Sequence, residues 1–300
     1  MTLDARALVD DLTALVRVPS VTGDERAALE LVCEQAARLG LDAWLEEEDL
    51  AALRAHPGHP GEEAPRTDLV NARVSRPGDG ARLALCAHID VVDPGSVPWT
   101  DGDPYSGAER DGAVYGRGSV DMKAGIVAAL HAIAAAASAN VDLLVVSSEE
   151  DGGLGAFAAL QRDAAYDACV IPEPTGFDVV CAQAGAITFR GVVEGVSAHA
   201  AERLHGVSAI DRYLPIHEAL AAYERSVNAD VEHPLMRALE LPYPLLVGRL
   251  NAGTWSSQVP DRLEFEGRAP VRIGESVAAA RAAVEAAAGM ALEWSGGSFA

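Results

Sequence analysis

Short apolar runs alternate with helix-like segments through the first part of the chain, and this alternation limits the fold more than any other feature. The runs 83–87 (LALCA) and 143–146 (LLVV) are typical of buried strands, and 168–171 (ACVI) repeats the pattern. Between them lie segments with helical spacing, including the alanine-rich stretch 120–139. Strands that alternate with helices predict an α/β domain with a mostly parallel sheet flanked by helices.

Each of these strands is followed by side chains that bind cations. The carboxyl ends of parallel strands meet at one edge of a sheet, which is where ligands gather in α/β proteins. The residues that follow the three strands are His88 and Asp90, Glu149 and Glu150, and Glu173. Asp121 precedes the alanine-rich helix, and from that junction its carboxylate can reach back toward His88.

One imidazole among several carboxylates suits a divalent cation, zinc first, with cobalt or manganese as alternatives. Two such ions about 3.5 to 4 Å apart can share an aspartate, polarise a carbonyl and activate a water. A carboxylate that does not bind metal then serves as general base. Glu149 and Glu150 can divide these roles, because consecutive side chains of an extended segment face different ways.

Two other interpretations of local motifs are weaker. His56 and His59, in HPGHP, are metal ligands by residue type, but such residues are more often exposed loop histidines. The glycines Gly152, Gly153 and Gly155 do not form GxGxxG, and the acids around them would repel a phosphate.

The remaining elements of the first part of the chain are read from apolar spacing. Helices are expected at 3–17 and 22–39, with Thr22 and Glu25 as a capping box that starts the second one. Further strands are expected at 41–45 and 69–74. Between these two strands, proline, glycine and charged residues predict a loop without a regular element.

The order of elements changes after about residue 182. The expected order is strand, helix, strand, strand, helix, strand, at 186–194, 207–227, 243–250, 263–273, 276–288 and 291–294. This is the ferredoxin-like βαββαβ unit. We therefore expect two domains, residues 1–182 and 183–300.

Charge and cysteine usage exclude several classes of function. With 23 basic and 45 acidic residues the formal net charge is -22, which would repel both nucleic acid and anionic membranes. The four cysteines form no CxxC pair, which fits reduced thiols, and the acidic amino terminus lacks a secretory signal. We expect a cytoplasmic protein.

Four motifs together closely resemble the metal-binding motifs of the M20 metallopeptidases, the family of acetylornithine deacetylase, succinyl-diaminopimelate desuccinylase and carboxypeptidase G. The motifs are HIDVV, DGAVYGRGSVDMKAG, SSEEDGG and IPEPT. The later segments GVSAHAAERLHGVSAI and WSSQVPDRLEFEGR resemble the family's lid domain. The resemblance implies a zinc-exopeptidase-like catalytic domain, a lid that forms a homodimer, and hydrolysis of the amide bond of an N-acyl amino acid or small peptide.

The resemblance also implies a role for each candidate residue. His88 and Glu173 would bind one metal ion, Asp121 would bridge to a second ion, and Glu150 would bind that second ion. Glu149 would be the general base for a metal-activated water, and Asp90 would hold His88. In the lid, His199 would stabilise the oxyanion, commonly in the partner subunit's site, and Arg268 would grip the substrate carboxylate.

One departure from the family concerns the end of the chain. Relatives return from the lid into the catalytic domain for a further segment that supplies another histidine to the second metal, whereas this sequence stops at LEWSGGSFA. We therefore expect the sequence to lack the C-terminal part of the catalytic domain. The alternative function is a noncatalytic remnant that acts as a binding or dimerisation module.

Overall fold

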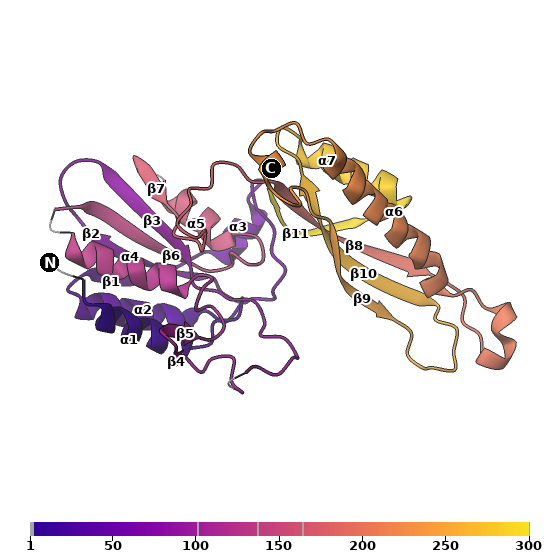
Figure 1. Ribbon diagram of the computed structural model, residues 1–300, viewed down its shortest axis with the longest axis horizontal. Helices are drawn as coiled ribbons and strands as arrows, with labels where there is room; N and C mark the ends of the chain where they lie inside the picture. The colour runs from indigo at the N-terminus through magenta and orange to yellow at the C-terminus, as the bar shows by residue number, and fades with distance from the viewer. Residues whose placement is uncertain (1–2, 101, 137, 164, 300) are drawn as a thin grey trace. The chain divides into compact units, whose positions relative to one another are not determined.

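The computed structural model describes residues 3–100, 102–136, 138–163 and 165–299. The chain forms two compact units, residues 1–179 and 180–300 (Figure 1). The boundary lies close to the expected division at residue 182. Each unit has its own sheet and its own apolar core.

Unit 1 is built on a five-stranded sheet with the order β1-β2-β6-β3-β7. The strands are β1 (Asp42–Glu47), β2 (Val70–Arg76), β6 (Asn140–Val146), β3 (Arg82–His88) and β7 (Ala168–Val170). Strands β6, β3 and β7 are parallel, and β2 runs antiparallel to both of its neighbours, so the predicted mostly parallel sheet is confirmed. His88 pairs with Val146, so β3 and β6 end side by side.

Helices cover both faces of this sheet, as the α/β prediction requires (Figure 1). The main core lies between the sheet and three helices, α1 (Ala5–Val16), α2 (Arg26–Arg38) and α4 (Lys123–Ala135). Helix α5 (Leu154–Arg162) contributes to a smaller cluster with Leu144 and Val146 of β6. These alternate with the β6 residues that point into the main core, as expected for a strand buried on both faces.

Unit 1 also contains short elements that the sequence analysis did not include. The short helix α3 (Leu50–Ala55) begins after Asp49, whose carboxylate accepts a hydrogen bond from the N–H of Ala52, and its leucines pack with α5. Strands β4 (Ala108–Arg110) and β5 (Ala113–Tyr115) form a hairpin within the long connection after β3. The prediction of no regular element between β1 and β2 was therefore wrong, because a side-chain cap and tertiary packing stabilise one short turn of helix.

The expected capping box at the start of α2 was also wrong. The helix begins at Arg26, and Glu25 accepts a hydrogen bond from the N–H of Gly23 through its Oε1 at 2.8 Å. The Thr22 hydroxyl instead donates to the carboxylate of Asp90 at 3.0 Å. Helix α4 is likewise shorter than the predicted 120–139; residue 137 of that range lies outside the described residues.

Unit 2 has the predicted ferredoxin-like order of elements. It consists of β8 (Gly185–Glu194), α6 (Ala209–Ala229), β9 (Leu246–Ala252), β10 (Arg262–Val271), α7 (Val277–Ala288) and β11 (Glu293–Phe299), with single 3-10 turns at Ala200–His205 and Met236–Ala238. The strands form an antiparallel sheet in the order β11-β8-β10-β9. Phe189 and Phe265 meet edge to face at its centre, with ring centroids 6.2 Å apart.

Strand β7 is an exposed edge of the unit 1 sheet. Its residues Ala168–Val170 are all exposed, Val170 by 55%, and the following Ile171 is 59% exposed. Within the described residues β7 pairs only with β3. This strand is therefore open on its outer side.

Among the described residues, no helix is long and apolar enough to cross a membrane.

A buried acid away from the carboxyl ends of the strands provides a test of how unit 1 is stabilised. Asp142 of β6 accepts hydrogen bonds from Ser75 at 2.6 Å, Tyr166 at 2.9 Å and Arg82 at 2.6 Å. Burial alone would raise the pKa of Asp142, but these donors hold it below its ordinary value. The stabilisation is therefore present above about pH 4 and is lost as the pH falls through the lowered pKa.

We expect Asp142→Asn to lower the free energy of unfolding by about 3 kcal/mol at pH 7, because a buried ion pair loses one partner. The difference from the wild type should shrink below about pH 4, where the wild-type carboxyl also becomes neutral. Urea unfolding at neutral and acid pH measures both effects. The exposed Asp42→Asn is the control, and an equal loss at both pH values would contradict the electrostatic explanation.

Candidate metal centre

His88 is fixed by its own loop. It is the last residue of β3, its side chain is 2% exposed, and its Nδ1 lies 2.9 Å from the backbone carbonyl oxygen of Asp90. A carbonyl can only accept a hydrogen bond, so Nδ1 carries the proton. Nε2 faces the opposite direction, so it is the ring nitrogen that can give up its proton and bind a metal.

Carboxylates from three other segments converge on His88 Nε2. The Asp121 Oδ1 lies 3.0 Å away, a Glu173 oxygen 3.7 Å away and a Glu149 oxygen 3.9 Å away. Asp121 comes from the junction before α4, Glu173 from the loop after β7 and Glu149 from the turn after β6. The structure therefore brings together side chains that are up to 85 residues apart, from His88 to Glu173.

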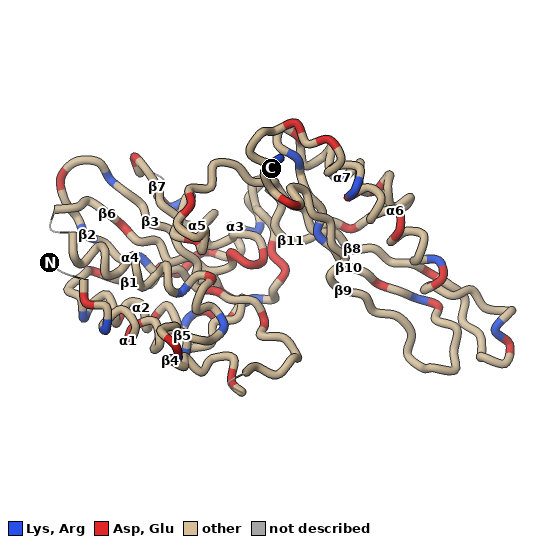
Figure 2. The backbone as a smooth tube through the Cα atoms, in the orientation of Figure 1, with Lys and Arg blue, Asp and Glu red and all other residues tan. Residues whose placement is uncertain are grey.

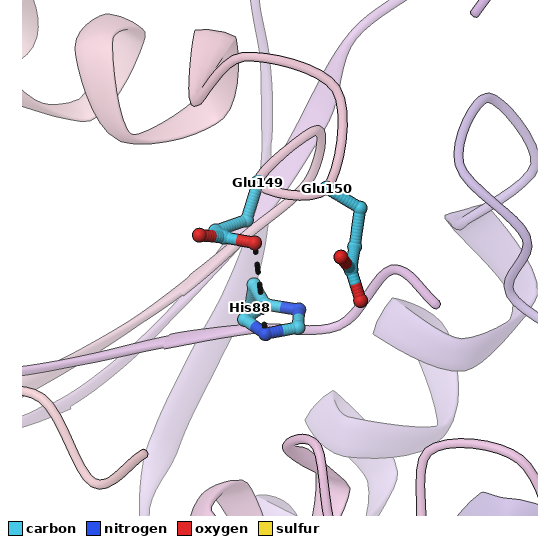
Figure 3. Close-up of side chains that lie close together, drawn as sticks. All are labelled: His88, Glu149 and Glu150. Atoms are coloured by element: carbon cyan, nitrogen blue, oxygen red, sulfur yellow. Dashed lines mark ion pairs between the residues drawn. The ribbon is translucent and has the colours of Figure 1, made fainter. Parts of the chain in front are cut away.

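These donors form two groups that share His88. One consists of His88, Asp121 and Glu173, and the other of His88, Glu149 and Glu150; in each, one ligand atom per residue lies within 4.8 Å of the others. Figure 3 shows Glu149 and Glu150 descending from the same turn on either side of the imidazole. The expectation that the two side chains face apart in an extended segment was wrong, because Glu149 and Glu150 lie in a turn and their carboxylates converge on the imidazole.

Asp90 supports the turn that carries both glutamates. Its side chain is fully buried, and its two oxygens accept the backbone N–H groups of Glu149 at 3.1 Å and Glu150 at 3.0 Å. The Thr22 hydroxyl donates to it as well, and His88 Nδ1 lies 3.6 Å from its Oδ1. Asp90 is thus an ionic neighbour of His88, while the hydrogen bond of the imidazole goes to the Asp90 carbonyl.

The carboxylates shift one another's pKa values. Burial and the charges of Asp121 and Glu149 raise the pKa of Glu150 to about 7, although His88 opposes this. Burial alone would lower the pKa of His88, but Asp90, Glu149 and Glu173 together raise it to about 10. Acidic segments are also common in the loops near α3 and α5 (Figure 2). The centre therefore holds an excess of negative charge that a cation would relieve.

The donor set fits a divalent cation by its chemistry. An imidazole Nε2 with its other nitrogen already bonded, and carboxylate oxygens from separate elements, are the ligands used by zinc, cobalt and manganese. Asp121 and Glu149 are 57% and 49% exposed, so the centre opens to solvent and to a small molecule.

The other candidate residues lie elsewhere. His199 and Arg268 belong to unit 2. The His199 ring lies 5.7 Å from the Trp255 ring, and Arg268 of β10 pairs with Thr188 of β8. His56 and His59 each accept a backbone N–H through Nδ1, from Gly58 and Gly61. Within the described part of the chain, neither histidine joins a group that could hold a metal.

Two glycines that follow the glutamates have structural roles. A Cβ on Gly155 would lie 2.2 Å from the Ser147 carbonyl oxygen, and Gly153 adopts φ +79 at the start of α5. Gly155 is required because a side chain would clash with the backbone of Ser147, and Gly153 is favoured because its φ lies in the left-handed region.

Thr22 is a member of the centre that the sequence did not reveal. Its hydroxyl reaches Asp90 across 68 residues, from a segment that looked like a helix start. The sequence showed only that Thr22 is a hydroxyl residue in a polar loop, and the capping-box pattern already explained it as a helix cap.

Comparison with known proteins agrees with this geometry. A family model described as peptidase family M20/M25/M40 matches residues 84–299. The chain belongs to this family. The match includes every proposed ligand and most of unit 2, so the resemblance seen in the motifs is confirmed.

Curated relatives give the same result over part of their length. The chain is 34% identical over 224 residues to a succinyl-diaminopimelate desuccinylase of Gluconacetobacter diazotrophicus, a match that covers 69% of this chain and 54% of that protein. A second desuccinylase, of Methylorubrum extorquens, is 31% identical over 227 residues, covering 70% and 55%. The chain thus spans about half the length of the curated relatives it matches.

Solved structures show the same fold. The M20 family metallo-carboxypeptidase Sso-CP2 of Sulfolobus solfataricus aligns with a TM-score of 0.67 at 16% identity, covering 97% of this chain and 77% of that one. Aminopeptidase PepT of Bacillus cereus aligns with a TM-score of 0.58 at 22% identity, covering 99% and 78%.

Proposed function

We propose that this M20 family chain is a metal-dependent hydrolase that cleaves the amide bond of an N-acyl amino acid or a small peptide. The observation that carries the proposal is the convergence of Asp121, Glu173 and Glu149 on the Nε2 of His88. Family membership supports amide hydrolysis, and the desuccinylase relatives favour an acylated amino acid as substrate.

The side chains divide into ligands and a base. His88 and Glu173 would hold one zinc ion, or cobalt or manganese in its place, Asp121 would bridge, and Glu150 would hold the second ion. A cation held there supplies positive charge that polarises the amide carbonyl and lowers the pKa of a water. Asp90 keeps the imidazole and the glutamate turn in position through its contacts with both.

Glu149 would move the proton. Its carboxylate is half exposed and comes from the same turn as Glu150, so it can reach both a water and the substrate. It accepts a proton from the water as the oxygen attacks the amide carbon. It then donates that proton to the nitrogen as the C–N bond breaks, giving a carboxylate and a free amine.

Unit 2 would contribute substrate contacts and the dimer interface. Arg190, Arg249 and Arg262 on its sheet pair with glutamates, whereas Arg268 has no ion pair with any described residue. An unpaired guanidinium is suited to bind a substrate carboxylate. His199 would stabilise the oxyanion, in the site of a partner subunit if unit 2 forms a homodimer.

We expect the two ions to bind with different affinities. Both described ligand groups use the same histidine, His88, and neither contains a second one. The ion at Glu173 would therefore keep an imidazole ligand, while the ion at Glu150 would depend on carboxylates and water. Titration of the metal-free chain with zinc should show one tight site and one weaker site.

The test of the function combines metal content with turnover. The purified chain is analysed for bound zinc, cobalt and manganese, and is assayed on N-acetyl and N-succinyl amino acids and on dipeptides. Bound metal with release of free amine is the expected result. Bound metal without turnover would favour the noncatalytic binding or dimerisation module, and absence of metal binding would overturn the proposal.

A further inference from the structure

The turn from Ser147 to Gly153, here called the glutamate turn, holds Glu149 and Glu150 in an unusual backbone conformation. Ser148 has a φ of 63 and is fully buried, so a residue other than glycine occupies the left-handed region. Such a conformation is unfavourable for a residue that carries a Cβ, and it persists only where surrounding contacts fix it. The contacts of this turn therefore determine where the two glutamates point.

Asp151 provides one set of these contacts. Its Oδ1 accepts a hydrogen bond from the Ser148 hydroxyl. Its Oδ2 accepts the backbone N–H groups of Glu63 at 3.1 Å and Ala64 at 2.8 Å. Asp151 thus ties the strained residue of the glutamate turn to the segment that precedes β2.

A buried arginine lies behind this carboxylate. The Arg66 side chain is 0% exposed, and one terminal nitrogen lies 3.7 Å from Asp151 Oδ1 and 3.4 Å from Glu25 Oε1. Its Nε is 3.8 Å from a Glu62 oxygen, and neither Nε nor the other terminal nitrogen has a hydrogen-bond partner among the described residues. Burying a guanidinium with incomplete pairing is costly, and removing it alone would leave the buried Glu25 and Asp151 carboxylates without this positive charge.

Glu25 links Arg66 to the segment that contacts Asp90, the second residue that supports the glutamate turn. Its Oε1 also accepts the N–H of Gly23, and the adjacent Thr22 donates its hydroxyl to Asp90. Asp90 in turn accepts the N–H groups of both Glu149 and Glu150. The two routes that fix the glutamate turn, through Asp151 and through Asp90, therefore meet at Arg66.

We propose that Arg66 is a positioning residue, which holds Asp151 and Glu25 and thereby fixes Glu149 and Glu150 for the hydrolysis. This role rests on the proposed function, because its effect on turnover requires a working general base. Arg66 has no contact with the metal-ligand group, so it would act only through these two carboxylates.

The test compares Arg66→Met and Arg66→Lys with Arg54→Met. Arg54 is a matched control because it shares Glu62 with Arg66 and donates a hydrogen bond to the Arg66 carbonyl, but has no hydrogen bond or ion pair with Asp151 or Glu25. Hydrogen exchange measured by mass spectrometry on a peptide covering the glutamate turn reports its order without any need for activity. We expect Arg66→Met to speed exchange there at least tenfold, Arg66→Lys to restore part of the protection, and Arg54→Met to change little.

Kinetics on the metal-loaded protein give the second readout. We expect Arg66→Met to lower kcat about 10- to 100-fold with KM nearly unchanged. The change should have little further effect in a Glu149→Ala background, because bound metal would hold Glu150 and leave Glu149 as the group through which Arg66 acts. An equal fractional loss in both backgrounds would overturn the positioning role. If Arg66→Met does not fold, Arg66→Lys carries both measurements.

The outcomes separate this inference from the proposed function. Faster exchange in the turn, in a chain whose wild type shows no turnover, would support the structural role of Arg66 and refute the hydrolase. Unchanged exchange in a folded Arg66 variant would refute the inference, whatever the activity of the wild type.

Discussion

Glu149→Ala is expected to keep its metal and to lose turnover by a factor of about 100 to 10,000, the usual contribution of a general base. Glu149 is the most distant of the three acids that face His88 Nε2, at 3.9 Å, and it is half exposed. Its removal leaves Asp121, Glu173, Glu150 and His88 in place. Metal content by elemental analysis and release of free amine measure the two effects separately.

Glu150→Ala is the matched control for this change, because it removes the neighbouring acid from the same turn. We expect it to lose the weaker ion. If both variants lose metal to the same extent, or if Glu149→Ala keeps full turnover, the division into base and ligand is wrong.

Asp121→Ala should lose metal as well as turnover. The Asp121 carboxylate lies 3.0 Å from His88 Nε2, closer than any other acid of the group, and it would contact both ions. The affinity should therefore fall by more than the 10- to 100-fold expected when a residue outside the ligand set is removed. Calorimetric titration of the metal-free variant with zinc measures this loss.

The control for Asp121 is Asp93→Ala, an exposed acid in the connection after β3. It should bind metal as the wild type does. Retention of both ions by a folded Asp121→Ala chain would show that this carboxylate does not bridge.

The sequence was sufficient to predict the architecture of both units. In unit 1, apolar runs at β3 and β6 identified the central strands because parallel strands are buried on both faces. In unit 2, the order of elements alone predicted the ferredoxin-like arrangement, which the antiparallel sheet β11-β8-β10-β9 confirms. Both predictions rest on the spacing of apolar residues, which reflects which side chains are buried and can be read from a short stretch of sequence.

The location of the centre was also predictable, for a related reason. His88, Glu149 and Glu173 each follow a strand, and the parallel pairing of β3 with β6 and β7 brings those ends together. Spatial proximity of these residues therefore follows from topology. The roles that we assign to them rest on chemistry and stay predictions.

The supporting contacts could not be predicted in the same way. Thr22 resembled a helix cap because its local sequence allowed that use, yet its hydroxyl bonds Asp90 from 68 residues away. Arg66 stands in the segment that was predicted to be a loop, and its side chain is fully buried against Asp151 and Glu25. Such contacts depend on how loops pack in three dimensions, and no periodic pattern in the sequence records them.

The wide spacing of the proposed ligands along the chain would couple cation binding to folding. His88, Asp121, Glu150 and Glu173 come from separate segments, so the unfolded chain would hold no site, and the free energy of binding would add to the stability of unit 1. A cation at 100 times its Kd would contribute about 2.7 kcal/mol. A substitution far from the centre that loosens unit 1 would thus weaken apparent metal affinity without touching a ligand, and the melting temperature of this unit would follow the free metal concentration.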